Sequence, residues 1–144
     1  MALVSGERWV CPHCSRPFGQ PNRPHTCVPA LSLDAYFAER PPAQRRIFEA
    51  VAAHMRELGG VDIEAVSVGI LFKASRTFAE LRPRRDGLAL TLLLARELRD
   101  PRVRRTMPGG AGRVAHVVEL HDAADVGEAV RAWLTEAYLG AAPQ

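Results

Sequence analysis

The chain has 144 residues, of which 47% are hydrophobic and 24% are charged, and its formal net charge is +3. This length suits one domain with a buried core and a small appendage, and the composition is typical of a globular protein in water. No apolar run reaches the roughly 18 residues that a transmembrane helix needs, and the first ten residues do not resemble a secretion signal. We therefore expect a cytoplasmic protein without a membrane partner.

All the cysteines lie near the start of the chain, at Cys11, Cys14 and Cys27, and His25 stands close to the last of them. This C-x2-C-x10-H-x-C array places two thiolates on one tight turn and brings a second pair of ligands from a returning loop. Such a set suits tetrahedral Zn²⁺, and His13 is a competing ligand that the turn would point away from the ion. We expect a zinc-ribbon-like unit over residues 1–30 that folds around Zn²⁺; three cysteines gathered by chance are the alternative.

Two helices are predicted after this unit. Ser32 can cap a short helix from residue 33 to about residue 39, which Pro41 ends. Pro42 can begin a second helix that runs to about Leu58, where two glycines stop it. This helix presents an apolar stripe to the core, formed by Ile47, Val51, Met55 and Leu58.

The pattern changes from helix to strand at Ile63, where apolar residues begin to alternate with other residues. An Asp-Gly pair at residues 86–87 marks a hairpin turn between two later strands. Along the strand before this turn, Phe78 has the same parity as Arg76 and Arg82, so we expect its ring on the open face of the sheet. Four strands are expected, over residues 63–73, 76–82, 88–94 and 114–120.

The arginine- and glycine-rich stretch 95–113 is expected to be a mobile loop. A last helix is predicted over residues 123–139, with Asp122 as its N-cap. The order of helix, helix, four strands and helix predicts an α+β domain over residues 31–144. We expect two layers, with a four-stranded antiparallel sheet that has its helices on one face.

The positive charge is concentrated in residues 73–113, where Lys73 and ten arginines stand against four acids, which gives this segment a net charge of +7. Arginine forks pair with phosphates, and an aromatic ring on a sheet face can stack on a base. We therefore predict that the open face and the loop bind DNA, RNA or another polyanion. The predicted contacts are Lys73, Arg76, Phe78, Arg82, Arg84, Arg85, Arg104, Arg105 and Arg113.

Other functions stay open at this point. The same patch could bind a small anionic ligand or an acidic protein partner, with residues 109–112 as a lid and the zinc unit as a clip or docking element. A solvated basic surface without a partner is a further alternative. Catalysis has the least support, because Ser67 lacks the first glycine of a nucleophile elbow and Lys73 belongs to no phosphate-binding loop. A binding protein is favoured over an enzyme.

Several runs in the domain, namely 70–73, 76–84, 100–102, 112–114 and 118–120, resemble a bacterial family catalogued as domain of unknown function 5655. The zinc segment, with Trp9 and Phe18 around its cysteines, is similar to a short N-terminal extension that some members carry. The family has no established activity. The resemblance implies a link to nucleic acid, because related domains are fused to nuclease-like and restriction-related partners.

Overall fold

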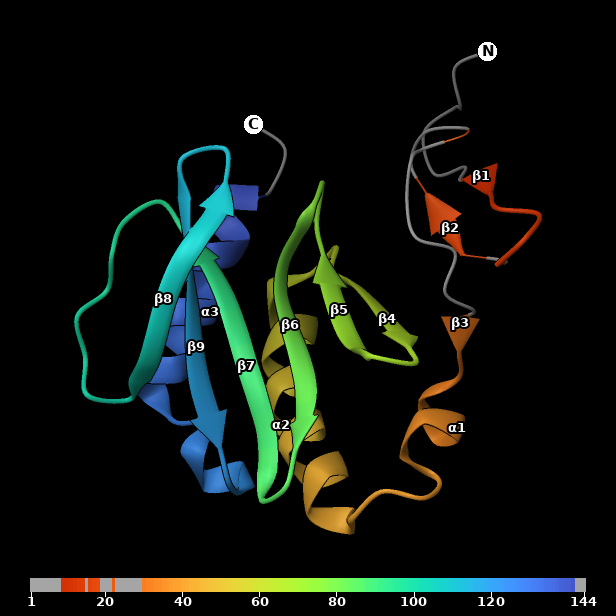
Figure 1. Cartoon of the computed structure of the whole chain (residues 1–144), viewed down its shortest axis with the longest axis horizontal. Coiled ribbons are helices and arrows are strands. Elements are labelled where there is room, and N and C mark those ends of the chain that lie inside the picture. The colour runs from red at the N-terminus through yellow and green to blue at the C-terminus, as the bar shows by residue number, and fades with distance from the viewer. Residues whose placement is uncertain (1–8, 15, 19–21, 23–29, 142–144) are drawn as a thin grey trace.

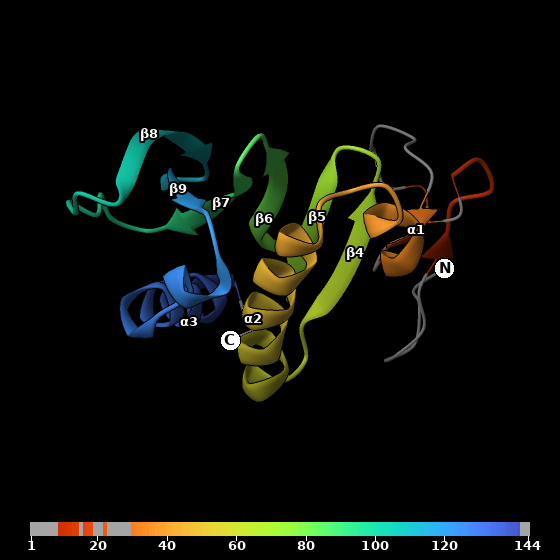
Figure 2. The same ribbon diagram turned by 90° about the horizontal axis from the view of Figure 1, so that it is seen from below.

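The computed structural model describes residues 9–14, 16–18, 22 and 30–141. In these residues the chain forms two sheets, one of two strands near the N-terminus and one of seven strands. Figure 1 shows the large sheet face on, and Figure 2 shows helices α2 and α3 together on one side of it. Within the described part of the chain, no helix has the length and apolar character that crossing a membrane requires.

The helices follow their local signals closely. Helix α1 (Leu33–Phe37) begins where the Ser32 hydroxyl accepts a hydrogen bond from the backbone N–H of Ala35 at 3.0 Å. Helix α2 (Pro42–Leu58) has the predicted bounds, with proline at its first position and Gly59 at its end in a positive-φ conformation.

The predicted last helix is divided in two. Asp122 caps a short 3-10 helix, η1 (Ala123–Asp125), and the chain then leaves the helical conformation at Val126. Helix α3 (Glu128–Ala141) starts afterwards. The capping box between Asp122 and Asp125 satisfies backbone N–H groups where this first turn begins.

The seven-stranded sheet has the order β3-β4-β5-β6-β7-β9-β8, and each neighbouring pair is antiparallel. The prediction of an α+β fold with an antiparallel sheet is therefore confirmed, and the prediction of four strands is wrong. The strands are β3 (Ala30–Leu31), β4 (Asp62–Val66), β5 (Gly69–Lys73), β6 (Thr77–Arg84), β7 (Gly87–Leu94), β8 (Val103–Gly110) and β9 (Arg113–Leu120).

Two of these strands come from one segment that we expected to be a single strand. The chain turns at Ser67 and Val68, so that Val66 pairs with Gly69 and the segment becomes the hairpin β4–β5. The turn changes which residues face the core: Ala65 and Ile70 belong to it, whereas Val68 is exposed. The apolar alternation runs through the turn, which is why the sequence pattern concealed it.

Strand β8 lies in the stretch that we expected to be a mobile loop. It pairs only with β9 and forms one edge of the sheet. Pro108, Gly109 and Gly110 have low strand propensity, but an edge strand tolerates proline because one side of its backbone needs no partner. The register with β9 shifts twice, between Val103 and Arg105 and between Pro108 and Gly110. Such bulges are a common protection of an edge strand.

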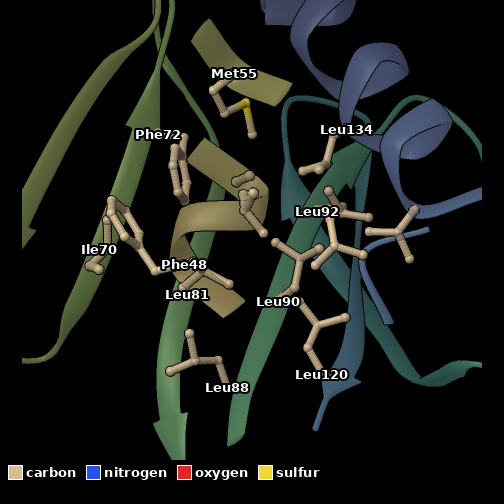
Figure 3. Packing of buried hydrophobic residues seen from close by; sticks show 14 of the residues in the cluster. Phe48, Met55, Ile70, Phe72, Leu81, Leu88, Leu90, Leu92, Leu120 and Leu134 are labelled. Atoms are coloured by element: carbon tan, nitrogen blue, oxygen red, sulfur yellow. The ribbon is translucent and has the colours of Figure 1, made fainter. Parts of the chain in front are cut away.

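The core lies between the sheet and the helices. Figure 3 shows Phe48 and Met55 of α2 and Leu134 of α3 packed against the strands. The strand residues in this cluster are completely or almost completely buried, and those labelled in the figure are Ile70, Phe72, Leu81, Leu88, Leu90, Leu92 and Leu120. Burial of this apolar surface is the main stabilising contribution to the fold.

Candidate anion-binding face and metal centre

The face of the sheet away from the helices can be assigned from the register. Residues directly opposite each other on antiparallel strands share a face. Leu90 pairs with Val118, and both lie in the core, so the intervening pairs Ala89–Glu119 and Thr91–Val117 point away from the helices. We call this side the open face. Figure 2 shows neither α2 nor α3 on this side of the strands from β6 to β9.

Four arginines stand on the open face on either side of its centre. Arg82 pairs with Ala89 and Arg84 with Gly87, which places both arginines on the open face of β6. Arg105 pairs with Val117, and Arg104 is the extra residue of a bulge, with its Nε 3.9 Å from Glu119 Oε2. We call Arg82, Arg84, Arg104 and Arg105 the flanking arginines. Because β6 and β8 are three strand spacings apart, the two pairs are separated by about 14 Å.

Acidic residues offset part of this charge. Arg82 Nε lies 3.1 Å from Glu80 Oε1, and Arg104 Nε lies 3.9 Å from Glu119 Oε2. Within the described part of the chain, Arg84 donates to the carbonyl oxygen of its neighbour Pro83 and to no other group. Arg85 and Arg105 are exposed and make no ion pair with any described residue. The open face therefore keeps a positive charge after its internal ion pairs are counted.

A small hollow of about 180 Å³ lies at the end of this face, between the β6–β7 turn and the end of β9. Its charged and polar lining consists of Arg84, Arg85, Asp86, Glu119 and His121. His121 Nε2 is 3.9 Å from Glu119 Oε2, so the imidazole is oriented toward a carboxylate. The hollow has the size for a small anion, although the carboxylate beside His121 opposes one electrostatically.

Lys73 was predicted to contact a polyanion, but its ammonium is held inside the protein. Lys73 Nζ lies 2.7 Å from Glu64 Oε2, and Glu64 Oε1 accepts a hydrogen bond from Arg16 Nε. Burial would raise the pKa of the Glu64 carboxyl, but the hydrogen bonds and charges of Lys73 and Arg16 outweigh burial and hold that pKa below its usual value. The Lys73 side chain is 17% exposed and paired with Glu64, so its contact with a polyanion stays a prediction that this pairing disfavours.

Arg76 and Arg113 also have partners within the fold. Both donate to the carbonyl oxygen of Gly140, Arg76 from Nη2 at 2.8 Å and Arg113 from Nη2. The backbone N–H and hydroxyl of Ser75 donate to the carbonyl oxygen of Ala141. The last carbonyls of a helix lack partners within it and carry partial negative charge, which cations stabilise. These two arginines therefore cap the C-terminus of α3 and are less available to a partner.

Phe78 was predicted on the open face and is instead in the core. The β5–β6 register shifts at this point, because Phe72 pairs with Ala79 whereas Lys73 pairs with Thr77. Phe78 is the extra residue of this bulge, and its completely buried ring meets Tyr138 of α3 edge to face at 5.8 Å. The parity argument failed because a bulge reverses the alternation of sides.

The N-terminal unit gathers two of the four predicted zinc ligands. Cys11 and Cys14 occupy the turn between β1 (Trp9–Val10) and β2 (Pro17–Phe18), and both are buried. They form a small cluster with Phe18, and Trp9 packs against it. The other predicted ligands, His25 and Cys27, lie outside the described residues. Within the described ranges no three His, Cys, Asp or Glu side chains come together, so the fit to a metal rests on this buried cysteine pair.

Sequence reasoning did not identify the contact between the N-terminal unit and the sheet. Arg16 and Glu64 are far apart in the chain, and neither is one of the predicted zinc ligands. Only the register of β4 with β5, which places Asp62 opposite Lys73 and Glu64 opposite Leu71, brings Glu64 close to Lys73. A carboxylate within an alternating strand segment was the one available signal.

Comparison with known proteins assigns most of the chain to one family. Residues 33–140, from the start of α1 almost to the end of α3, match the model of a family described as a domain of unknown function (DUF5655). No curated protein and no solved structure gives a significant match.

Proposed function

We propose that this chain, which belongs to the DUF5655 family, binds the phosphate backbone of nucleic acid on the open face of its sheet. The observation that supports the proposal is the position of the flanking arginines, in two pairs on either side of a centre that includes Ala89, Thr91 and Glu119. A guanidinium presents two parallel N–H donors to a phosphate and keeps its charge at every physiological pH. Exposed guanidinium groups on the face that the helices leave uncovered suit a polyanion that lies across the sheet.

The composition of this face suggests how the nucleic acid would be recognised. Phe78 is the only aromatic residue in β6, β7, β8 and β9, and it is buried. Stacking on bases therefore contributes little on these strands, and the binding energy comes from phosphate contacts that do not depend on sequence. We expect the protein to bind with little sequence preference and with strong salt dependence.

The salt dependence can be given a size. If Arg85 joins the flanking arginines, five phosphate contacts give a slope of about −4.5 for log affinity against log salt on duplex DNA. This slope corresponds to a loss of roughly 500-fold in affinity between about 50 and 200 mM salt.

A second candidate function is the binding of a small anion in the hollow, where the guanidinium groups of Arg84 and Arg85 would attract an anion against the carboxylates of Asp86 and Glu119. A ligand of this kind makes few ionic contacts, so its affinity would depend weakly on salt. Titration with inorganic phosphate in a calorimeter separates this candidate from the first. One saturable site that the Arg85→Ala variant abolishes would support it.

We also propose that the N-terminal unit holds Zn²⁺ through Cys11, Cys14, His25 and Cys27. The buried cysteine pair on a tight turn supports this assignment, because a two-residue spacing offers both thiolates to one ion. With four protein ligands the site is closed, so the ion would order the unit and leave no position for a substrate.

Fluorescence anisotropy with labelled single-stranded and duplex oligonucleotides at several salt concentrations tests the main proposal. The informative variant combines Arg84→Ala, Arg85→Ala and Arg105→Ala, because none of these residues has an acidic partner among those described. For this variant on duplex DNA, the slope of log affinity against log salt should be smaller in magnitude by about 2.7, which is the contribution of three phosphate contacts.

A matched control removes three arginines from the helical layer, with Arg46→Ala, Arg56→Ala and Arg131→Ala on α2 and α3. The net charge of the two variants is the same, so a general charge effect would weaken both equally. The proposal requires the control to keep most of its affinity and slope. Equal weakening of both variants, or no binding of the unmodified protein at low salt, would refute the open face as a nucleic-acid interface.

A further inference from the structure

The positive residues of the open face form two groups that are separated by two strands. Arg82 and Arg84 lie on β6, and Arg85 follows them in the turn to β7. We call these three residues the β6 group. Arg104 and Arg105 lie on β8, and we call them the β8 group. Figure 1 shows β7 and β9 between β6 and β8, so the two groups stand on strands about 14 Å apart.

The floor between the two groups gives an unpaired base little to contact. Ala89 of β7 and Ala115 and Val117 of β9 point to the open face, and their exposed fractions are only 2%, 5% and 6%. Phe78, the only aromatic residue in β6, β7, β8 and β9, is buried in the core. Proteins that bind single strands gain much of their affinity by stacking bases on aromatic rings, and these strands offer no exposed ring.

A carboxylate stands on the direct path from one group to the other. Arg82, Ala89 and Glu119 occupy one row across β6, β7 and β9. The Glu119 side chain is 37% exposed, and its Oε2 lies 3.9 Å from Arg104 Nε. The row therefore runs from a cation over an alanine and a carboxylate to a second cation. A single phosphate backbone that joined the two groups would cross the carboxylate, which repels phosphate.

Two separate backbones avoid this carboxylate. In a duplex, two phosphate strands border each groove, and the grooves of B-form DNA are about 6 Å and 12 Å wide. With one backbone over each arginine group, Glu119 would face the groove between them. On the β6 side the backbone would follow the arginines toward the turn and away from Glu80, the ion-pair partner of Arg82. Asp86 of the turn opposes this path, but the charge of the two arginines directly before it exceeds its own.

We propose that the open face binds duplex nucleic acid across one groove, with the β6 group on one phosphate strand and the β8 group on the other. The inference rests on the function proposed above and adds to it the form of the nucleic acid. A duplex engages both groups at once without placing a phosphate over Glu119. Its density of phosphate charge is also higher than that of a single strand, which strengthens the ionic contacts.

A duplex with one uncharged strand tests whether both strands are contacted. The first probe is a labelled DNA duplex. The second, the half-neutral duplex, has the same length and sequence, but one of its strands carries neutral methylphosphonate linkages. Fluorescence anisotropy at several salt concentrations gives the slope of log affinity against log salt for each probe. The unmodified protein is compared with the Arg104→Ala, Arg105→Ala double variant, and thermal melting followed by circular dichroism checks that the variant stays folded.

The two probes should respond differently to the loss of the β8 group. On the DNA duplex the slope should fall in magnitude from about −4.5 to about −2.7, because two phosphate contacts are lost. On the half-neutral duplex only one group meets a charged strand. The unmodified protein should therefore have a slope of about −2.1 there, the value for three contacts with a single charged strand. The double variant should leave that slope unchanged, because the β6 group makes these contacts.

A matched control combines Arg56→Ala on α2 with Arg131→Ala on α3. This control changes the net charge by the same amount as the double variant but acts on the helical layer. It should keep the slopes of the unmodified protein on both probes. If the control instead lowers the slope on the DNA duplex as much as the double variant does, net charge alone explains the effect and the inference is refuted.

The remaining outcomes separate this inference from the proposed function. A half-neutral duplex that keeps a slope of about −3.5, which the double variant then lowers, would mean that all five arginines contact one strand. Nucleic-acid binding would then stand and the duplex inference would be wrong. If the protein does not bind the DNA duplex at low salt, the proposed function and this inference fall together. Binding of the DNA duplex without measurable binding of the half-neutral duplex supports the inference, because phosphates of both strands are then required.

Discussion

The substitution Glu64→Gln should destabilise the zinc-loaded protein at neutral pH. It removes the carboxylate that accepts hydrogen bonds from Arg16 and Lys73. The two largely buried cations then face a neutral amide. Hydrogen bonds that involve a charged group contribute about 1.5 to 3 kcal/mol each, and the amide oxygen retains part of one of them. We therefore expect the free energy of unfolding to fall by about 2 to 3 kcal/mol.

Urea unfolding followed by far-UV circular dichroism at pH 7 measures this loss. The matched control is Glu57→Gln on α2, whose side chain is 80% exposed and faces only His54 at 3.9 Å. This control should change the free energy of unfolding by less than about 0.5 kcal/mol. Equal stability of the two variants would show that the contacts of Glu64 with Arg16 and Lys73 do not stabilise the fold.

The loss of stability in the Glu64→Gln variant should also depend on pH, and the pKa of Glu64 determines the direction. The pKa of Glu64 lies below its ordinary value of 4.5 in the folded protein, mainly because the bonds from Lys73 and Arg16 outweigh the opposing effect of burial. A carboxylate with a lowered pKa stabilises the fold fully above about pH 4.5, and this contribution disappears as the pH falls through the folded-state value.

The difference in free energy of unfolding between the unmodified protein and the Glu64→Gln variant should therefore become smaller below about pH 4.5. A pH series on chelator-treated protein keeps metal release out of the comparison, and Lys73 is then the remaining partner. A gap that widens on acidification would contradict the argument.

Two further substitutions test the fold around the open face. His116 is completely buried and its Nε2 accepts from the backbone N–H of Leu98 at 2.8 Å, so His116→Leu should cost about 1 to 3 kcal/mol. It should also speed hydrogen exchange at the Leu98 amide, and unchanged exchange would contradict the assignment. In Gly87→Ala the new Cβ would overlap the carbonyl oxygen of Leu120, so we expect a loss of about 2 to 4 kcal/mol in urea unfolding. The control Gly127→Ala has room for its Cβ, and a similar loss there would argue against a specific clash.

The sequence predicted best those elements whose signals are local. Helix α2 has its predicted bounds because Pro42 and the glycines after Leu58 act on the backbone around them. Strand β8 was missed because its conformation depends on pairing with β9, and Pro108 with its glycines obscured any strand pattern. Pairing is a contact between distant segments, and local propensity does not report it.

The predictions for the candidate site also succeeded where the signal was local and failed where it depended on the tertiary fold. The proline-flanked cysteine turn was recognisable, and Cys11 and Cys14 are buried together. Phe78 was assigned to the wrong face, because a one-residue bulge is invisible in the alternation of residue types. The partners of Lys73 and Arg76 were also missed, since Glu64 and the carbonyl oxygen of Gly140 reach them only through the tertiary fold.

These partners change what the charge of the segment 73–113 means for binding. Lys73 is paired with Glu64, and Arg76 and Arg113 donate to the carbonyl oxygen of Gly140 near the end of α3. A count of basic residues therefore overstates the surface that a polyanion can reach. The flanking arginines and Arg85 therefore limit the salt slope for duplex DNA to about −4.5.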